Sequence, residues 1–228
     1  MQLFAPLMHP AADIAPLLAT WIRGWALVRG LPAPVAVHDG AWKVDVGLPD
    51  QLVRYVIPDG KPELVAQLSR ELRAPATWLK ICAAPDAVTA LLPSHWEMSE
   101  LRYFMRTTLV ETANLSVPSG FALSLTETGA VTRAVVTTNS GQIAADGNLI
   151  MLGRQATFDQ IGTGAAFRRR GLGRLVMQSL ANHAKKRGAA EGLLVATAAG
   201  QQLYLTLDWQ TLSPYTSAFI PALPPKTS

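Results

Sequence analysis

The chain has 228 residues, of which 49% are hydrophobic and 16% are charged. A chain of this composition can bury a substantial core, which excludes an intrinsically disordered protein. The formal net charge of +4 is too small to indicate nucleic-acid binding, because that function requires cations clustered on one face.

The cysteine count and the N-terminal sequence bear on the cellular location of the protein. The single cysteine, Cys82, excludes an intrachain disulfide. The N-terminal stretch has no basic segment, and its apolar run from Ile14 to Ile22 is interrupted by Pro16 and Thr20. Such a run is too short to span a bilayer and does not resemble a signal peptide. We therefore expect a soluble, cytoplasmic protein with neither a membrane nor a nucleic acid as partner.

The first half of the sequence is typical of a small α+β domain. Apolar residues three and four positions apart predict a helix that Gly30 ends. Alternating apolar and polar residues then predict short strands, and Pro62 opens a second helix. The expected elements are a helix over 11–29, strands at 34–37, 42–46 and 52–57, a helix over 62–73, a strand at 77–82, a short helix, and a strand at 101–109.

The second half follows a connector rich in Asn, Ser, Pro and Gly over residues 111–120. We place a domain boundary there, which gives an N-terminal α+β domain over 1–115 and a second domain over 116–228. The second domain is expected to contain strand 121–127, helix 130–138, two strands within 142–152 that turn at Asp146-Gly147, strand 155–163, helix 171–187, strand 192–197, helix 199–207, and terminal strands.

The segment RRRGLGR, residues 168–174, lies between a predicted strand and a predicted amphipathic helix. The first turn of a helix presents unpaired N–H groups and the positive end of the helix dipole. Gly171 and Gly173 allow an anion to approach the backbone closely, and three arginines add planar donors suited to phosphate. Against the alternative of a solvated basic turn, this context predicts a pyrophosphate site at the start of the helix.

The loop matches neither the P-loop pattern nor the G-x-G-x-x-G dinucleotide pattern. It does match Arg/Gln-x-x-Gly-x-Gly/Ala through Arg168, Gly171 and Gly173. Residues 120–220 thereby resemble the GNAT superfamily of N-acetyltransferases, in which this loop holds the pyrophosphate of acetyl-CoA. Tyr204, in LYLTLDW, stands where the family has a tyrosine beside the CoA sulfur, and Asp208 stands where the family usually has glycine.

The resemblance implies a fold and a donor. The implied fold is α+β, a GNAT fold with a central mixed, mostly antiparallel sheet flanked by helices, joined to the N-terminal α+β domain. That domain is faintly similar to a GNAT unit without its cofactor site, as in tandem members. The implied cofactor is acetyl-CoA, and the residues expected to bind it are Ile161, Gly162, Thr163, Arg168, Arg169, Arg170, Gly171, Leu172, Gly173 and Arg174.

The resemblance also implies an activity, the direct transfer of acetyl to the amine of a small-molecule or amino-acid-like acceptor. A backbone N–H of strand 158–163 would bind the thioester oxygen, and Tyr204 would be the acid that serves the leaving thiolate. Asp159 is the candidate base, weighed against a surface or turn-paired carboxylate.

Several alternatives stay open at this point. They are a non-catalytic CoA-binding sensor or scaffold, an acyltransferase that uses a longer acyl-CoA, and a peptide or protein N-terminus as acceptor. A homodimer is also left open. His9, His38 and His95 have no partners at ligand spacing, so no metal is predicted. Aromatic residues crowd the first half, which leads to the hypothesis that it shapes acceptor specificity.

Overall fold

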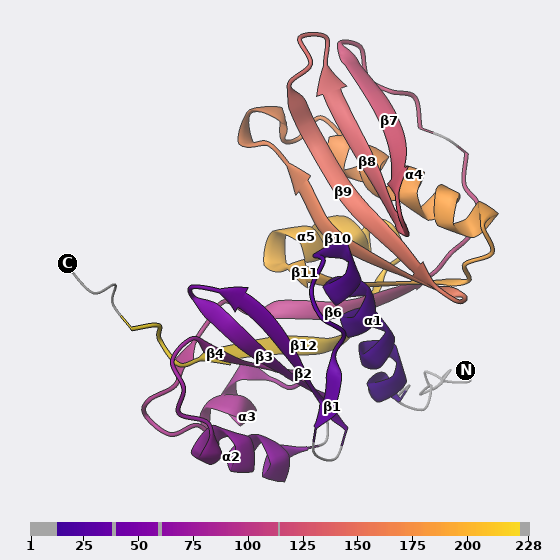
Figure 1. The fold of residues 1–228 in the computed structure, drawn as a ribbon. Coiled ribbons are helices and arrows are strands. Elements are labelled where there is room, and N and C mark those ends of the chain that lie inside the picture. The colour runs from indigo at the N-terminus through magenta and orange to yellow at the C-terminus, as the bar shows by residue number, and fades with distance from the viewer. Residues whose placement is uncertain (1–12, 38–39, 59–60, 114, 224–228) are drawn as a thin grey trace, which may run out of the picture.

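A computed structural model describes residues 13–37, 40–58, 61–113 and 115–223 (Figure 1). The elements of the first half are α1 (Ile14–Val28), β1 (Val35–Val37), β2 (Ala41–Leu48), β3 (Gln51–Ile57), α2 (Pro62–Glu71), β4 (Thr77–Ile81), α3 (Pro85–Thr89), β5 (Glu97–Met98) and β6 (Arg102–Thr108). The second half contains β7 (Phe121–Thr128), β8 (Val131–Thr138), β9 (Ile143–Leu152), β10 (Gln155–Thr163), the short 3-10 helix η1 (Ala165–Phe167), α4 (Leu172–Lys186), β11 (Glu191–Thr197), α5 (Ala198–Leu205) and β12 (Gln210–Phe219).

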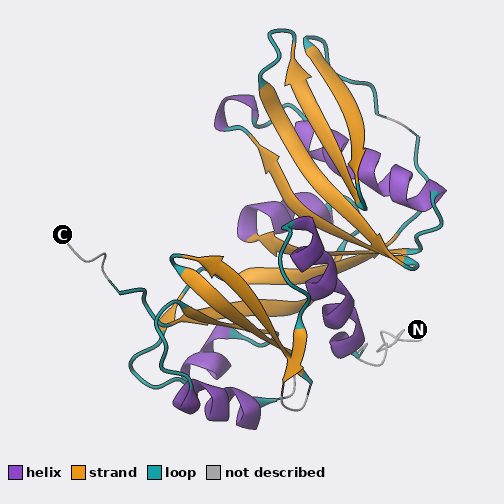
Figure 2. Ribbon diagram, viewed as in Figure 1, coloured by secondary structure: helices purple, strands orange, loops and turns teal. Residues whose placement is uncertain are grey.

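All of these strands belong to one hydrogen-bonded array with the order β1-β2-β3-β4-β12-β6-β11-β10-β9-β8-β7, and β5 pairs with β12 beside this path. Only β3–β4 and β10–β11 are parallel among the strand pairs of the described chain. The prediction of a mixed, mostly antiparallel sheet with flanking helices is thus confirmed (Figure 2).

The array forms two lobes that share strand β12. Residues 210–215 of β12 pair with β6, whereas residues 216–219 pair with β4. Figure 1 shows the strands β7 to β10 in one lobe and β1 to β4 in the other, with β12 and β6 between them. The last strand in the sequence therefore contributes to both halves of the molecule.

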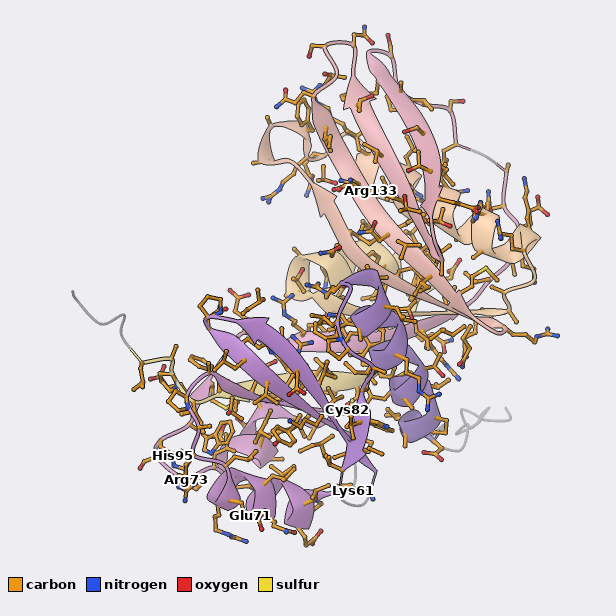
Figure 3. All side chains as sticks on the ribbon, in the orientation of Figure 1. Lys61, Glu71, Arg73, Cys82, His95 and Arg133 are labelled. Carbon is orange, nitrogen blue, oxygen red and sulfur yellow. The ribbon has the colours of Figure 1, made fainter. Side chains whose placement is uncertain are left out.

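Helix α1 lies between the two lobes. Its N-cap, Asp13, accepts a hydrogen bond from the Ala15 N–H at 3.1 Å. Its apolar residues pack with Val44 and Val56 of one lobe and with Leu193 of the other. Figure 3 shows side chains filling this region around the labelled Cys82, which belongs to the same buried cluster.

Gly24 lets α1 sit directly on the sheet, because a Cβ at this position would collide with Oγ1 of Thr157 on β10. Helices α4 and α5 lie on the other face of the same strands. Alternation along β11 shows this, since Leu193 packs in the cluster with α1 whereas Leu194 packs with α4 and Tyr204. Strands β9, β10 and β11 are thus covered on both faces.

Two predictions about the second half are wrong. Residues 130–138, predicted as a helix, form strand β8 between β7 and β9. The segment is rich in β-branched Val and Thr, and its alternate residues Ala134 and Val136 are fully buried toward α4.

Residues 142–152, predicted as two strands that turn at Asp146-Gly147, form the single strand β9. The Asp146 carboxylate accepts a hydrogen bond from Arg133 on the neighbouring strand at 2.7 Å. Gly147 does not form a turn. It allows the Ile161 side chain to pack closely against the backbone of β9, because a Cβ at residue 147 would collide with that side chain.

The terminal strands, predicted as two segments, form the single strand β12, and the short strand β5 was not predicted. The remaining predicted elements agree with the structure within a few residues at their ends, although residues 11 and 12 of the first helix lie outside the described residues. The boundary near residue 115 stays a prediction. Sheet pairing crosses it, because β6 lies between β11 and β12, and α1 packs on β10 and β11.

Candidate functional site

A gap opens between the parallel strands β10 and β11. The two strands pair only through residues 155–157 of β10, which then continues to Thr163 paired with β9 alone. A bulge between Asp159 and Gly162, with Gln160 at φ 54°, bends β10 at this point. The backbone N–H groups on this edge of β10 beyond Thr157 therefore have no partner strand.

The N-terminus of α4 opens beside the gap. Its N-cap, Gly171, has φ 77° and provides no capping side chain. The first backbone bond of the helix runs from the Leu175 N–H to the Gly171 carbonyl at 3.0 Å, so the N–H groups of residues 172–174 have no acceptor within the helix. Arg169 in the loop also has a left-handed φ of 63°, a conformation found in backbone turns that bind anions.

A pocket of about 760 Å³ connects the α4 terminus with the gap. Most of the predicted cofactor-binding residues line it together: Ile161, Gly162, Thr163, Arg168, Arg169, Gly171, Leu172, Gly173 and Arg174. A Cβ on Gly173 would lie 3.3 Å from both Thr163 Oγ1 and Leu203 Cδ2, so a larger side chain would narrow the pocket. We refer to it as the α4 pocket.

Two predicted site residues lie outside this lining. The Arg170 guanidinium lies 6.0 Å from the centre of the Phe121 ring, on the side of β7. Asp159 forms an ion pair with Arg29, the C-cap of α1, with 2.8 Å between Arg29 Nε and Asp159 Oδ2 and 3.3 Å between the second pair of atoms. The candidate base is thus a carboxylate whose charge an arginine already offsets.

Tyr204 lines the α4 pocket from α5 and is only 6% exposed. Burial, with a smaller contribution from the Asp159 charge, raises the pKa of its phenol to about 12. The phenol is therefore neutral at physiological pH and can donate a hydrogen bond. Gly200 leaves room for the ring, since a Cβ there would lie 3.2 Å from Tyr204 Cε2.

Asp208, which departs from the family pattern, has φ 60° and occupies the left-handed region where glycine is favoured. Aspartate tolerates this conformation better than most residues do. The backbone of the turn is preserved, because the Trp209 N–H bonds the Tyr204 carbonyl at 3.1 Å.

Sequence reasoning missed several residues of the pocket, which are contributed by the start and length of α5: Thr197, Ala199, Gly200, Gln202, Leu203 and Thr206. The spacing of Gly200 four residues before Tyr204 was a signal, because these positions share one helix face. No comparable signal linked Arg29 to Asp159, which is 130 residues away in sequence.

Two further findings concern membrane-spanning helices and metal ligands. No helix in the described ranges is long and apolar enough to cross a membrane. The described part of the chain also contains no group of three or more His, Cys, Asp or Glu residues that could hold a metal ion. His9 and His38 lie outside the described residues.

Comparison with known proteins places the fold. No protein-family model matches the sequence, and no curated protein matches it. Solved structures do match. One is a GCN5-related N-acetyltransferase from Kribbella flavida, with TM-score 0.63 and 16% identity over 92% of this chain and 97% of that chain. Another, from Sphaerobacter thermophilus, has TM-score 0.60 and 14% identity over 96% and 97%.

A tandem GNAT protein from the clavulanic acid biosynthesis pathway also matches, with TM-score 0.51 and 12% identity over 70% of this chain and 68% of that chain. The first two matches extend across the region on both sides of residue 115, so the likeness is not confined to the segment that carries the loop. The chain therefore has the fold of the GCN5-related N-acetyltransferases over most of its length.

Proposed function

We propose that this protein is an acetyl-CoA-dependent N-acetyltransferase that acts on the amine of a small-molecule or amino-acid-like acceptor. The observation that carries the proposal is the α4 pocket. It joins an uncapped helix N-terminus, suited to a pyrophosphate, to a strand gap where a neutral tyrosine is buried.

The residues that line the α4 pocket support the binding of coenzyme A. The N–H groups of residues 172–174 would bind the pyrophosphate, while Arg168 and Arg169 would offset its charge. The first turn of α4 contains no acidic residue that would repel the phosphates. The pantetheine arm would follow the free edge of β10 past Gly162 toward Tyr204.

The reaction requires one bond to form and one to break. The neutral amine attacks the thioester carbonyl carbon, the new C–N bond forms, and the C–S bond breaks. A free N–H of β10 would stabilise the oxygen as it gains charge. The amine loses one proton and the sulfur gains one, so the products are an amide and a free thiol.

Tyr204 would bind the leaving sulfur. A phenol with a pKa of about 12 is a weaker acid than a free thiol, whose pKa is about 8.5. Full proton transfer from Tyr204 to the thiolate is therefore uphill, and a hydrogen bond to the developing thiolate is the role that its burial supports. For Asp159 we propose a positioning role, because Arg29 already binds both of its oxygens.

The deciding experiment measures thiol release from acetyl-CoA in the presence of a panel of primary amines, with mass spectrometry of the products. We expect thiol release that depends on both the amine and the protein. Tight acetyl-CoA binding without thiol release for any amine would instead indicate a sensor or scaffold. Faster thiol release from butyryl-CoA or a longer acyl-CoA than from acetyl-CoA would indicate an acyltransferase that uses a longer acyl donor.

A further inference from the structure

Three basic side chains lie on the α1 face of the sheet, opposite the α4 pocket. They are Arg54 on β3, Lys80 on β4 and Arg102 on β6, and we call them the cation cluster. The strand register places them on one face. Residues two apart on a strand, and residues paired across strands, point to the same face of a sheet. Arg54 therefore shares a face with Val56 and with its partner Lys80. Lys80 pairs with Ser217 on β12, and Tyr215, two residues before Ser217, pairs with Arg102.

The cation cluster lacks acidic partners. Lys80 is only 6% exposed, and its Nζ donates a hydrogen bond to Ser217 Oγ at 2.9 Å. The Arg54 guanidinium lies 3.9 Å from the centre of the Trp25 ring and donates to Gln51 Oε1 at 3.1 Å. Within the part of the chain that the structure describes, no Asp or Glu forms an ion pair with any of the three.

Three buried donors in or beside the cation cluster have no partner in the described chain. Arg54 Nε, Gln51 Nε2 and the Tyr215 hydroxyl are buried and have no hydrogen-bond partner among the described residues. A buried donor that is left unsatisfied destabilises the folded protein. Two of the three atoms can only donate, and the phenol also can donate. The shared requirement of the group is an acceptor oxygen.

The mutual repulsion of the cations is consistent with this requirement. Burial, followed by the charges of Arg54 and Arg102, lowers the pKa of Lys80 to about 6. Burial likewise lowers the pKa of Arg54 to about 10. A protein keeps such an arrangement at a cost in stability, which a bound anion would offset.

The cation cluster adjoins the strand gap. Arg102 pairs with Thr197, the last residue of β11, where α5 begins. Asp159 lies on the other side of the gap, on β10, and its charge acts on both Arg54 and Tyr204. Tyr204 packs with the α4 side of the sheet and Tyr215 with the α1 side. The acetyl group and the cation cluster would thus face each other across the gap.

Building on the function proposed above, we propose that the cation cluster binds a carboxylate of the acceptor and thereby directs its amine into the gap. The two arginines offer planar forks that match a carboxylate, and the Tyr215 hydroxyl and Gln51 amide complete a set of neutral donors. The acceptor is accordingly an amino acid or another small amine that carries a carboxylate.

The test compares acceptors that differ only in this group. Glycine, β-alanine and 4-aminobenzoate are each paired with the corresponding carboxamide, and aminomethylphosphonate represents a dianionic group. We expect kcat/KM to be at least about tenfold higher for the best carboxylate than for its amide, as expected for a charged hydrogen-bonded contact. In Arg102→Gln this ratio should fall to near one, through a higher KM for the carboxylate alone.

Arg54→Gln provides a second variant in case Arg102→Gln does not fold. Arg23→Gln, an exposed arginine on α1, is the matched control and should keep the wild-type ratio. Equal or faster turnover of the amides, or a ratio that neither cluster variant changes, would overturn the proposal. A preference for the phosphonate over every carboxylate would overturn the choice of carboxylate.

Failure of the proposed function can be told apart from failure of this inference. If no amine releases thiol, the same carboxylates and amides are titrated calorimetrically into the CoA-loaded protein. Carboxylate binding that Arg102→Gln abolishes would then support the cation cluster without catalysis. Equal binding of acids and amides would refute it.

Discussion

The two faces of the gap between β10 and β11 differ in how they present positive charge. On the α4 face, the charge comes from backbone N–H groups and from arginines that are exposed, Arg168 and Arg169. On the α1 face, it comes from the guanidiniums of Arg54 and Arg102 on separate strands. The almost fully buried Lys80 beside them has a pKa of about 6 and is mostly neutral at neutral pH. The first face is built by a continuous loop, whereas the second exists only after distant strands have paired.

This difference indicates a division of labour. A site made of backbone groups at a helix terminus recognises a feature that all CoA thioesters share, their pyrophosphate. A site made of buried side chains discriminates more sharply, because each buried group penalises a ligand that leaves it unpaired. We therefore expect substitutions on the two faces to affect different kinetic constants.

The largest effect is expected at the mouth of α4. In Gly171→Glu, a carboxylate would oppose the bound phosphates and weaken acetyl-CoA binding by at least about 100-fold, because like charges at a binding site cost several kcal/mol. Isothermal titration calorimetry measures this directly.

The matched control is Gly188→Glu, at the other end of the same helix. Gly188 also has a left-handed φ, of 94° against 77° at Gly171, and both positions have open space for a side chain. Both variants thus carry similar backbone strain and the same added charge. Equal losses of affinity in the two would show that strain and not the phosphate site is responsible.

The next largest effect is expected at Tyr204, between the two faces. Tyr204→Phe should lower kcat about 30-fold and leave the KM for acetyl-CoA nearly unchanged, since the hydrogen bond forms as the sulfur leaves. Tyr55→Phe, at a partly buried tyrosine that packs against the core of the other lobe, is the control.

The raised pKa of Tyr204 adds a pH signature. Because the phenol stays protonated up to about pH 12, it contributes no loss of activity between pH 8 and 10. The pH profiles of wild type and Tyr204→Phe should therefore have the same shape over this interval. An alkaline limb that disappears in the variant would contradict the assignment.

A smaller effect is expected from the Arg29–Asp159 pair. If Asp159 positions and does not act as base, Asp159→Asn and Arg29→Gln should each lower kcat/KM by about tenfold, and the double variant should be no worse than either, as for contacting residues. Steady-state kinetics of the wild type, the two single variants and the double variant provides this double-mutant cycle. A much larger loss in Asp159→Asn alone would restore the role of base.

The smallest effect concerns stability on the α1 face. The pKa of Lys80 is lower in the folded protein than in the unfolded chain, so the unfolded state binds more protons between about pH 6 and 10.5. The stability of the wild type should therefore rise with pH in this range, and the cost of burying Lys80 is largest below pH 6.

Lys80→Met removes this contribution. We expect the variant to be more stable than wild type, by an amount that is larger at pH 5.5 than at pH 8.5 in urea unfolding. Lys186→Met, at the exposed end of α4, should show no such difference. A gain that is the same at both pH values would mean that Lys80 stays protonated in the folded protein over this range, as it is in the unfolded chain.

The two faces also differ in how well the sequence predicted them. The loop at 168–174 and Tyr204 could be recognised because short spacings encode them, and nine predicted residues line one pocket with Tyr204. The helix predicted at 130–138 was wrong although its β-branched residues favour a strand, and the turn predicted at Asp146-Gly147 was wrong because a short polar pair was read without knowledge of the neighbouring strands. The cation cluster could not be predicted, since its members are brought together only by the register of β3, β4, β12 and β6.

Strand β12 has a consequence for biosynthesis. The chain emerges from the ribosome N-terminus first, yet β4 and β6 gain their shared neighbour only when residues 210–219 have been made. Until then both lobes expose unpaired strand edges, which are prone to join other chains. Translation of the final strand is thus the event that closes both lobes at once, and a nascent chain that stalls before it would depend on chaperones to stay free of aggregation.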